Sequence, residues 1–243
     1  MMASRSRLIP GKRFWGANVF PSFILYLSCF AVLMCIGIFP AGVRADEFSQ
    51  VSHYTAGLFP RGTLYVDTRI GNIRVEGWEE PGVEIEAEKV VNAGSEAKAR
   101  RLFGQIRIEL KENGEEAFLR TLYPPRRPWR LFRGATKLSA NFRIRMPYQA
   151  NLTLRCIDGD VTIRGVEGQQ DVRVSYGNVE VTVPSVDRLR LLSARSFLGY
   201  AQSDLNGENE AGFARGVSFW NPQGEQEIRV RVRMGGVYIY HAQ

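Results

Sequence analysis

The chain has 243 residues, of which 23% are charged, and its formal net charge is +7 at pH 7. Five of the 32 basic residues and none of the 25 acidic residues lie before residue 46, so the remainder carries 27 − 25, about +2. The basic balance therefore belongs mostly to the N-terminal segment and is poor evidence for a protein that binds nucleic acid.

Residues 1–45 have the order of a secretory signal. Basic residues precede an apolar run, Phe23 to Phe39, and small residues at Val43 and Ala45 precede Asp46. An uncleaved anchor is the alternative, because this run of 17 residues, apolar apart from Ser28 and Gly37, is at the lower limit for spanning a bilayer. We expect an exported protein in the periplasm, on the cell surface or secreted.

The exported part is expected to be a linker over 46–59 followed by one domain over 60–243. Only Cys156 remains there, so no internal disulfide can form and the fold depends on packing. Cys156 is in phase with Leu152 and Leu154, which favours a small buried side chain over a reactive thiol.

One pattern occurs four times, in "TRIGNIRVEG" (68–77), "CIDGDVTIRG" (156–165), "SYGNVEV" (175–181) and "VRMGGVYIY" (232–240). A glycine is followed by a small polar residue or a second glycine, and apolar residues alternate on both sides. Eighteen of the twenty residues at positions −7, −5, −3, +2 and +4 from the glycine are apolar, Thr68 and Gln170 being the exceptions. Period-two alternation predicts half-buried strands. The glycines that would turn the chain are Gly71, Gly159, Gly177 and Gly235.

Two kinds of turn fit these glycines. A two-residue hairpin would give an antiparallel β-sandwich, whereas a corner would carry the chain onto the next layer of a stack. Gly159 and Gly177 are 18 residues apart, and Gly199, Gly216 and Gly235 continue at 22, 17 and 19. This near-constant period favours an all-β fold of the β-solenoid type, similar to a right-handed parallel β-helix.

The strongest repeats are "GTLYVDTRIGNIRVEGWEEPGVEIEAEK", "LTLRCIDGDVTIRGVEGQQDVRVSYGNVEV" and "IRVRVRMGGVYI". Over about residues 60–240 the chain resembles the bacterial putative-adhesin domain of unknown function, a group of exported β-solenoid repeats sometimes called toast-rack. The resemblance implies a surface role and supplies no catalytic residue or cofactor. The loop-rich stretch 184–227 departs from a smooth repeat.

Two insertions follow the first corner. Residues 95–103 are expected to form a short helix with Ser95 as N-cap, a Glu96–Arg100 pair, and Leu102 and Phe103 packed on the sheet edge. Residues 105–123 alternate on both sides of Asn113-Gly114, which predicts a β-hairpin.

Basic residues suggest a surface for anionic ligands. A proline-rich loop, 124–137, and the last strand both contain them, although a solvated loop is the alternative for the first. We expect an envelope polysaccharide or another surface protein as partner, no nucleic acid, and membrane contact only through an uncleaved N-terminal segment. The candidate residues are Arg126, Arg127, Trp129, Arg130, Arg133, Arg229, Arg231 and Arg233.

An enzyme that processes polysaccharides is one alternative, and a membrane-anchored sensory or regulatory ectodomain is another. The enzyme would need clustered carboxylates, or calcium, on one face. The candidates Asp158, Asp160, Glu167 and Asp171 occupy turns and connections, where acids are common. His53 and His241 have no partner at zinc-ligand spacing. We therefore expect no catalytic residue, metal or cofactor.

Overall fold

The computed structural model describes residues 46–124, 138–205 and 209–242. The N-terminal segment and most of the basic loop, including its five candidate residues, lie outside the described residues. Within the described part of the chain, no helix is long and apolar enough to cross a membrane.

The described part is all-β with one short helix, α2 (Glu96–Phe103). The strands before the basic loop are β1 (Asp46–Ala56), β2 (Leu58–Ile70), β3 (Ile73–Trp78), β4 (Val83–Ala93), β5 (Arg107–Glu112) and β6 (Gly114–Leu122). The strands after it are β7 (Leu138–Pro147), β8 (Asn151–Asp158), β9 (Val161–Arg164), β10 (Gln170–Tyr176), β11 (Val179–Val183), β12 (Leu189–Ser203), β13 (Asn209–Trp220) and β14 (Gln226–His241).

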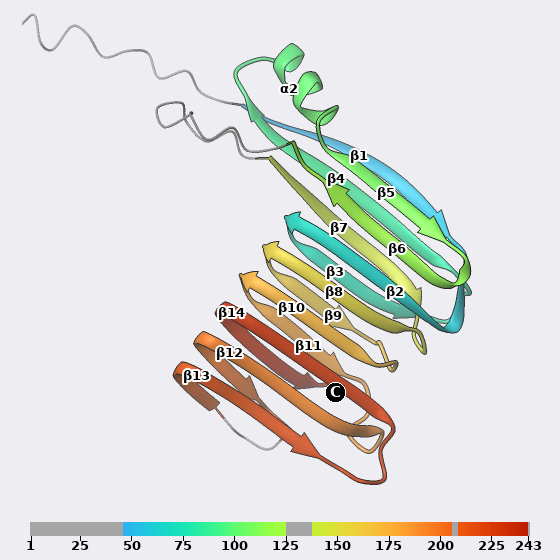
Figure 1. Ribbon diagram of the computed structural model, residues 1–243, viewed down its shortest axis with the longest axis vertical. Coiled ribbons are helices and arrows are strands. Elements are labelled where there is room, and N and C mark those ends of the chain that lie inside the picture. The colour runs from blue at the N-terminus through green and yellow to red at the C-terminus, as the bar shows by residue number, and fades with distance from the viewer. Residues whose placement is uncertain (1–45, 125–137, 206–208, 243) are drawn as a thin grey trace, which may run out of the picture. The chain divides into compact units, whose positions relative to one another are not determined.

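The repeated units form layers joined by parallel pairing. Each layer consists of two strands, or the two arms of one strand, on either side of a corner glycine: β2–β3, β8–β9, β10–β11 and β14 (Figure 1). The strand before the glycine pairs in parallel with its equivalents, in the order β2, β8, β10, β14. The strand after it does the same, in the order β3, β9, β11, β14. The corners are therefore not hairpins.

The sheet is mixed, so the expectation of a parallel fold interrupted by a single β-hairpin was wrong in part. Antiparallel pairs occur at both ends of the layers: β1 with β4, β4 with β7, β5 with β6, and β12 with β13. Only β5–β6 and β12–β13 join strands that follow one another in the chain, as a short connection permits. β1–β4 and β4–β7 pair strands that are separated by other elements.

The layers also do not follow chain order. β14 lies between β10 and β12, so the Gly235 corner follows Gly177 in space and precedes Gly199. The stretch expected to be loop-rich contains the long strands β12 and β13. Gly216 makes no corner of this kind: it pairs with Arg195, and Gly199 pairs with Gly212.

The interior matches the sequence pattern closely. All twenty positions that the four repeats assign to the inside are buried, each at 4% relative exposure or less. The two polar exceptions, Thr68 and Gln170, are 1% and 2% exposed. Cys156 is 3% exposed, as its phase in β8 predicts. Aliphatic rows from successive layers therefore cover one another and form one core.

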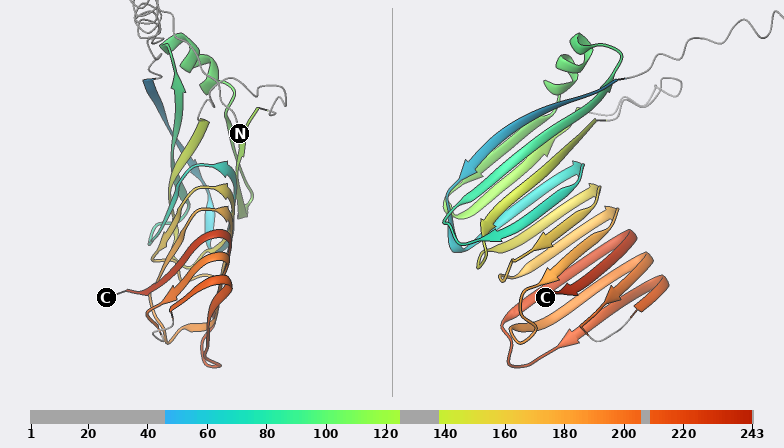
Figure 2. Two further views of the ribbon diagram at one scale, coloured as in Figure 1. Left: turned by 90° about the vertical axis from the view of Figure 1, so that its left-hand side faces the viewer. Right: turned by 180° about the vertical axis from the view of Figure 1, so that it is seen from behind.

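The corner glycines are required by their neighbours as well as by their own backbone. Gly159 and Gly177 have φ values of +150° and +132°, which other residues rarely adopt. A Cβ on Gly159 would lie 2.1 Å from the oxygen of Gly71, and one on Gly177 would lie 2.2 Å from the oxygen of Gly159. Figure 2 shows the bends of these layers stacked along one narrow edge. Only glycine permits this close approach.

The residue after each glycine also links the layers. The Oδ1 atom of Asn72 accepts from the backbone N–H of Asp160 (3.0 Å), and Asp160 Oδ1 accepts from that of Asn178 (2.8 Å). Asn178 Oδ1 accepts from the N–H of Gly236 (2.8 Å). We call Asn72, Asp160 and Asn178 the Asx line. Asn and Asp at this position thus bond to the neighbouring layer.

The N-terminal part combines confirmed and corrected expectations. Helix α2 is capped by Ser95, whose Oγ accepts from the N–H of Lys98, and a Glu96–Arg100 ion pair is present. The hairpin at Asn113-Gly114 joins β5 and β6 as expected. Residues 46–56, expected to be part of a linker, form strand β1 and pair with β4 over their whole length.

Candidate functional site

The candidate residues on the last strand are accessible. Arg229, Arg231 and Arg233 alternate on β14 with the buried Val230 and Val232, and all three arginines are exposed. Arg229 pairs with Glu227 at 2.7 Å. The alternation places the three side chains on the outer side of the sheet, as predicted.

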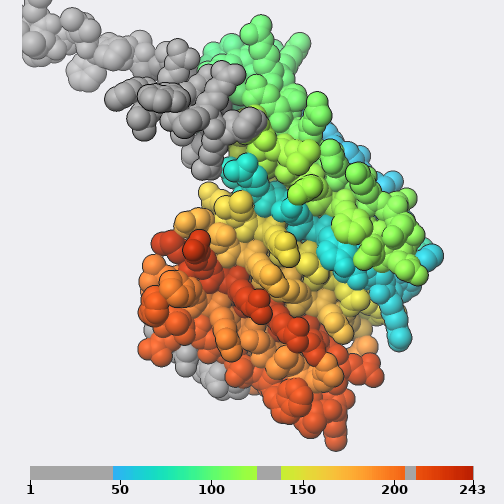
Figure 3. Space-filling model, in the orientation of Figure 1, coloured from blue at the N-terminus to red at the C-terminus, as the bar shows by residue number. Residues whose placement is uncertain are grey.

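A longer basic row crosses the strands. Arg231 is in register with Arg173 on β10 and with Arg195 on β12, and Arg173 is in register with Arg155 on β8. We call Arg155, Arg173, Arg231 and Arg195 the arginine ladder. All four are exposed. Adjacent strands lie about 4.8 Å apart, so the ladder spans about 14 Å. Figure 3 shows β14, in red, running between the neighbouring strands of this surface.

Few acids neutralise the arginine ladder. Arg173 pairs with Asp171 at 2.7 Å, whereas Arg155, Arg195 and Arg231 have no ion pair among the described residues. Asp67 lies opposite Arg155 on β2, but its ion pair is with Arg120, at 3.5 Å. Like charges directly opposite one another destabilise a sheet. The row is therefore a positive surface that attracts anions.

The other outer face of the molecule is neutralised. Glu84 and Glu86 on β4 are in register with Arg145 and Arg143 on β7, and their ion pairs measure 3.6 and 3.3 Å. Farther along that face, Arg164 on β9 pairs with Glu180 on β11 at 3.0 Å. In these pairs a basic residue meets an acidic one on the next strand, whereas Arg74 on β3 is in register with Arg143.

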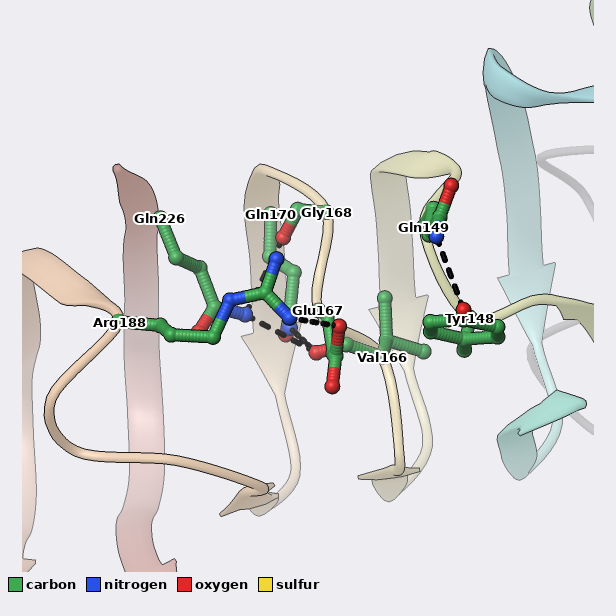
Figure 4. A network of polar contacts seen from close by, with 8 residues as sticks. All are labelled: Tyr148, Gln149, Val166, Glu167, Gly168, Gln170, Arg188 and Gln226. Atoms are coloured by element: carbon green, nitrogen blue, oxygen red, sulfur yellow. Dashed lines mark hydrogen bonds and ion pairs between the residues drawn. The ribbon is translucent and has the colours of Figure 1, made fainter. Parts of the chain in front are cut away.

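The four candidate acids do not form one site. Asp158 and Asp160 flank a corner glycine, and Asp160 takes part in the Asx line. Glu167 lies in the connection between β9 and β10, where Arg188 donates to its carboxylate (Figure 4). Asp171 is paired with Arg173. Each acid therefore has a turn or ion-pair role at a different place.

Figure 4 also shows how that connection is held. The backbone oxygen of Val166 accepts from Nε2 of Gln170 and from Nε2 of Gln226, each at 2.9 Å. The Gln226 amide also donates to the Gly168 oxygen at 3.3 Å. These buried amides satisfy backbone oxygens between layers, which explains two glutamines in a largely aliphatic interior.

The remaining titratable candidates are separate from the arginine ladder. His53 is on β1 opposite Glu86, and His241 ends β14. Within the described ranges, no three metal-ligating side chains lie close enough to hold an ion. Burial raises the pKa of the Cys156 thiol to about 11, so the thiol stays protonated at neutral pH.

Sequence reasoning singled out Arg231 but missed the rest of the arginine ladder. The signal was present, because each ladder residue stands four positions before a glycine: Gly159, Gly177, Gly235 or Gly199. The residue four positions before each of these glycines faces outward. The four arginines form one row only because the layers pair in register.

Comparisons with known proteins give structural matches of low identity. A putative cell adhesion protein from Clostridium sporogenes is 10% identical, with a TM-score of 0.49, covering 81% of this chain and 100% of that one. A putative adhesin from Bacteroides fragilis is 11% identical, with a TM-score of 0.23, covering 79% and 97%. A putative adhesin from Parabacteroides merdae is 9% identical, with a TM-score of 0.20, covering 80% and 97%.

No family model matches the chain, and no curated protein matches it. The three similar structures described above are named as adhesion proteins or adhesins of the kind that the sequence resemblance indicates.

Proposed function

We propose that the chain is an exported, non-enzymatic module of the bacterial cell envelope that binds anionic envelope components. Its fold would be a β-solenoid in which each layer holds its outward side chains in fixed register with the next. The ligand classes suggested by the sequence are an envelope polysaccharide or another surface protein.

The arginine ladder is the observation that carries this proposal. Arginine side chains bind carboxylates and phosphates through two parallel hydrogen bonds. In-register pairing fixes the spacing of four such groups without any loop having to become ordered. The dispersal of Asp158, Asp160, Glu167 and Asp171 supports a binding role over hydrolysis of the acid-pair kind.

Retention on isolated cell envelopes tests the proposal. The exported protein should be retained at low salt and released at high salt. Replacing Arg229, Arg231 and Arg233 together with Ser should weaken retention at least about tenfold, since each arginine contributes on the order of 1 kcal/mol at an anionic surface. A matched control replaces three exposed arginines elsewhere, Arg61, Arg74 and Arg107, with Ser. Equal retention of both triple variants and the parent would contradict the proposal.

The basic loop needs its own variant. Replacing Arg126, Arg127 and Arg130 with Ser separates its contribution from that of β14, and salt-insensitive, unchanged retention would remove the loop from the binding surface. Product release from uronic-acid polymers, with or without calcium, would favour the enzyme. A mature protein that begins at Asp46 would argue against an anchored ectodomain.

A further inference from the structure

A second row of side chains lies beside the arginine ladder at the glycine corners. Tyr176, Met234, Leu198 and Phe213 stand in register on β10, β14, β12 and β13. Their exposed fractions are 45, 42, 47 and 64%. We call these four residues the apolar ridge. A contiguous exposed apolar row of this kind marks an interaction surface.

The ridge is the densest part of a larger apolar edge. Seven of the twelve large hydrophobic residues that are exposed in the described ranges lie at these corners: Ile157, Tyr176, Phe197, Leu198, Tyr200, Phe213 and Met234. Phe197 packs edge-to-face on Phe213, with ring centroids 4.4 Å apart. The ridge ends at β8, where Asp158 occupies the place equivalent to Tyr176.

The two rows have a constant separation. On β10, β12 and β14, the ridge residue stands three positions after the ladder residue, as in Arg231 and Met234. Three residues of strand span about 10 Å. The arginine ladder thus runs parallel to the apolar ridge and lies about 10 Å farther from the glycine corners along the strands.

We propose that this edge docks on an anionic lipid bilayer, with the apolar ridge in the interface and the arginine ladder at the depth of the phosphates. Peripheral proteins bury their apolar residues about 5–10 Å deep, at the boundary between headgroups and acyl chains, which matches the separation of the two rows. Basic side chains near an anionic leaflet strengthen such binding.

A bilayer accounts for both rows, whereas an acidic polysaccharide would account for the arginines alone. The inference rests on the proposed function, because it names the envelope component that the arginines contact. It adds membrane contact through the folded domain to the contact that the sequence suggested for an uncleaved N-terminal segment.

Co-sedimentation with vesicles tests the inference. The protein is isolated as cells export it, its N-terminus is measured, and it is mixed with vesicles of phosphatidylcholine alone or of equal parts phosphatidylcholine and phosphatidylglycerol. We expect binding to the anionic vesicles only. The ladder variant, Arg195→Gln with Arg231→Gln, should bind them about tenfold or more weakly at low salt. Its control, Arg74→Gln with Arg107→Gln, removes the same charge elsewhere and should stay within about twofold of the parent.

The ridge has its own pair of variants. Leu198→Ser with Phe213→Ser should weaken binding about tenfold at both low and high salt, because apolar insertion is not screened. Val51→Ser with Phe59→Ser removes exposed apolar side chains from β1 and β2 and should have no effect. Each variant's thermal unfolding is measured so that misfolding is recognised. In Leu198→Trp, brominated lipids should quench the new tryptophan.

Other results would overturn the inference while leaving the proposed function intact. If the protein is retained on envelopes in a salt-sensitive way but does not bind vesicles, the membrane inference is wrong and the proposed function stands. Binding to polygalacturonate that depends on the ladder but not on the ridge would assign the surface to polysaccharide. A dimer in sedimentation velocity that Leu198→Ser with Phe213→Ser abolishes would assign the ridge to a second copy of the chain. Loss of envelope retention altogether would count against both proposals.

Discussion

The two outer faces of the described part of the molecule arrange their charged side chains differently. On the face formed by β4, β7, β3, β9 and β11, most acidic and basic residues meet across strands, as in Glu86–Arg143 and Glu180–Arg164, although Arg74 on β3 is in register with Arg143. On the face formed by β8, β10, β14 and β12, arginine meets arginine. Both faces pack on one core, so packing of the interior does not require the difference in charge. The balanced face has the arrangement expected from stability alone, whereas the arginine ladder opposes it.

Replacing a corner glycine should have the largest effect on the free energy of unfolding. Gly177→Ala would force a Cβ into the oxygen of Gly159, 2.2 Å away, at a φ of +132°. We expect a loss of about 3 kcal/mol or more in the free energy of unfolding, measured by chemical denaturation. Gly104→Ala is the control, because Gly104 has a φ of −64° and the nearest atom to its added Cβ lies at 3.6 Å. Similar losses in both variants would contradict the role of the corner.

The stability of the core should decrease at alkaline pH because of Cys156. Burial raises the pKa of its thiol to about 11, above the value of 9.0 for an unperturbed thiol. The folded state therefore keeps its full thiol contribution to stability below pH 9 and loses it as the pH rises towards 11, by up to about 3 kcal/mol. Cys156→Val should remove this part of the pH dependence. Rapid alkylation of the native protein at pH 8 would show instead that the thiol is accessible.

The Asx line should contribute less than the corner glycine next to it. Asn178→Ala removes the acceptor for the Gly236 N–H and a donor to Asp160, at 2.8 and 3.2 Å. We expect a loss of about 1 kcal/mol in thermal or chemical unfolding. Gln149→Ala provides the comparison, since this exposed amide bonds only to the neighbouring Tyr148 hydroxyl among the described residues, and it should change stability by less than about 0.5 kcal/mol.

Removing charged side chains should change the stability of the fold in opposite directions on the two faces. Arg195→Thr with Arg231→Thr relieves repulsion in the arginine ladder and should stabilise the fold by about 0.5 kcal/mol at low salt. Glu84→Gln with Glu86→Gln leaves Arg145 and Arg143 unpaired and should destabilise it by about the same amount. Both differences should shrink in 1 M NaCl. Destabilisation of both variants would mean that the ladder is not under electrostatic strain.

Local features could be predicted from the sequence because they depend on near neighbours. Ser95 caps α2 and Asn113-Gly114 turns the β5–β6 hairpin, each through contacts within a few residues. Strand β1 was missed, since residues 46–56 alternate weakly and their pairing with β4 depends on residues 83–93. The same reason applies to β12 and β13, whose polar stretches become strands by pairing with each other and with β14.

The order of residues along the chain suffices to show which side chains face inward and where the chain turns, because period two and the glycine corners are properties of one strand and its own turn. It could not determine which layers are neighbours. Only the tertiary structure placed β14 between β10 and β12, since the choice of a parallel neighbour depends on packing between segments far apart in the chain. That choice brought Arg231 between Arg173 and Arg195 and so created the arginine ladder.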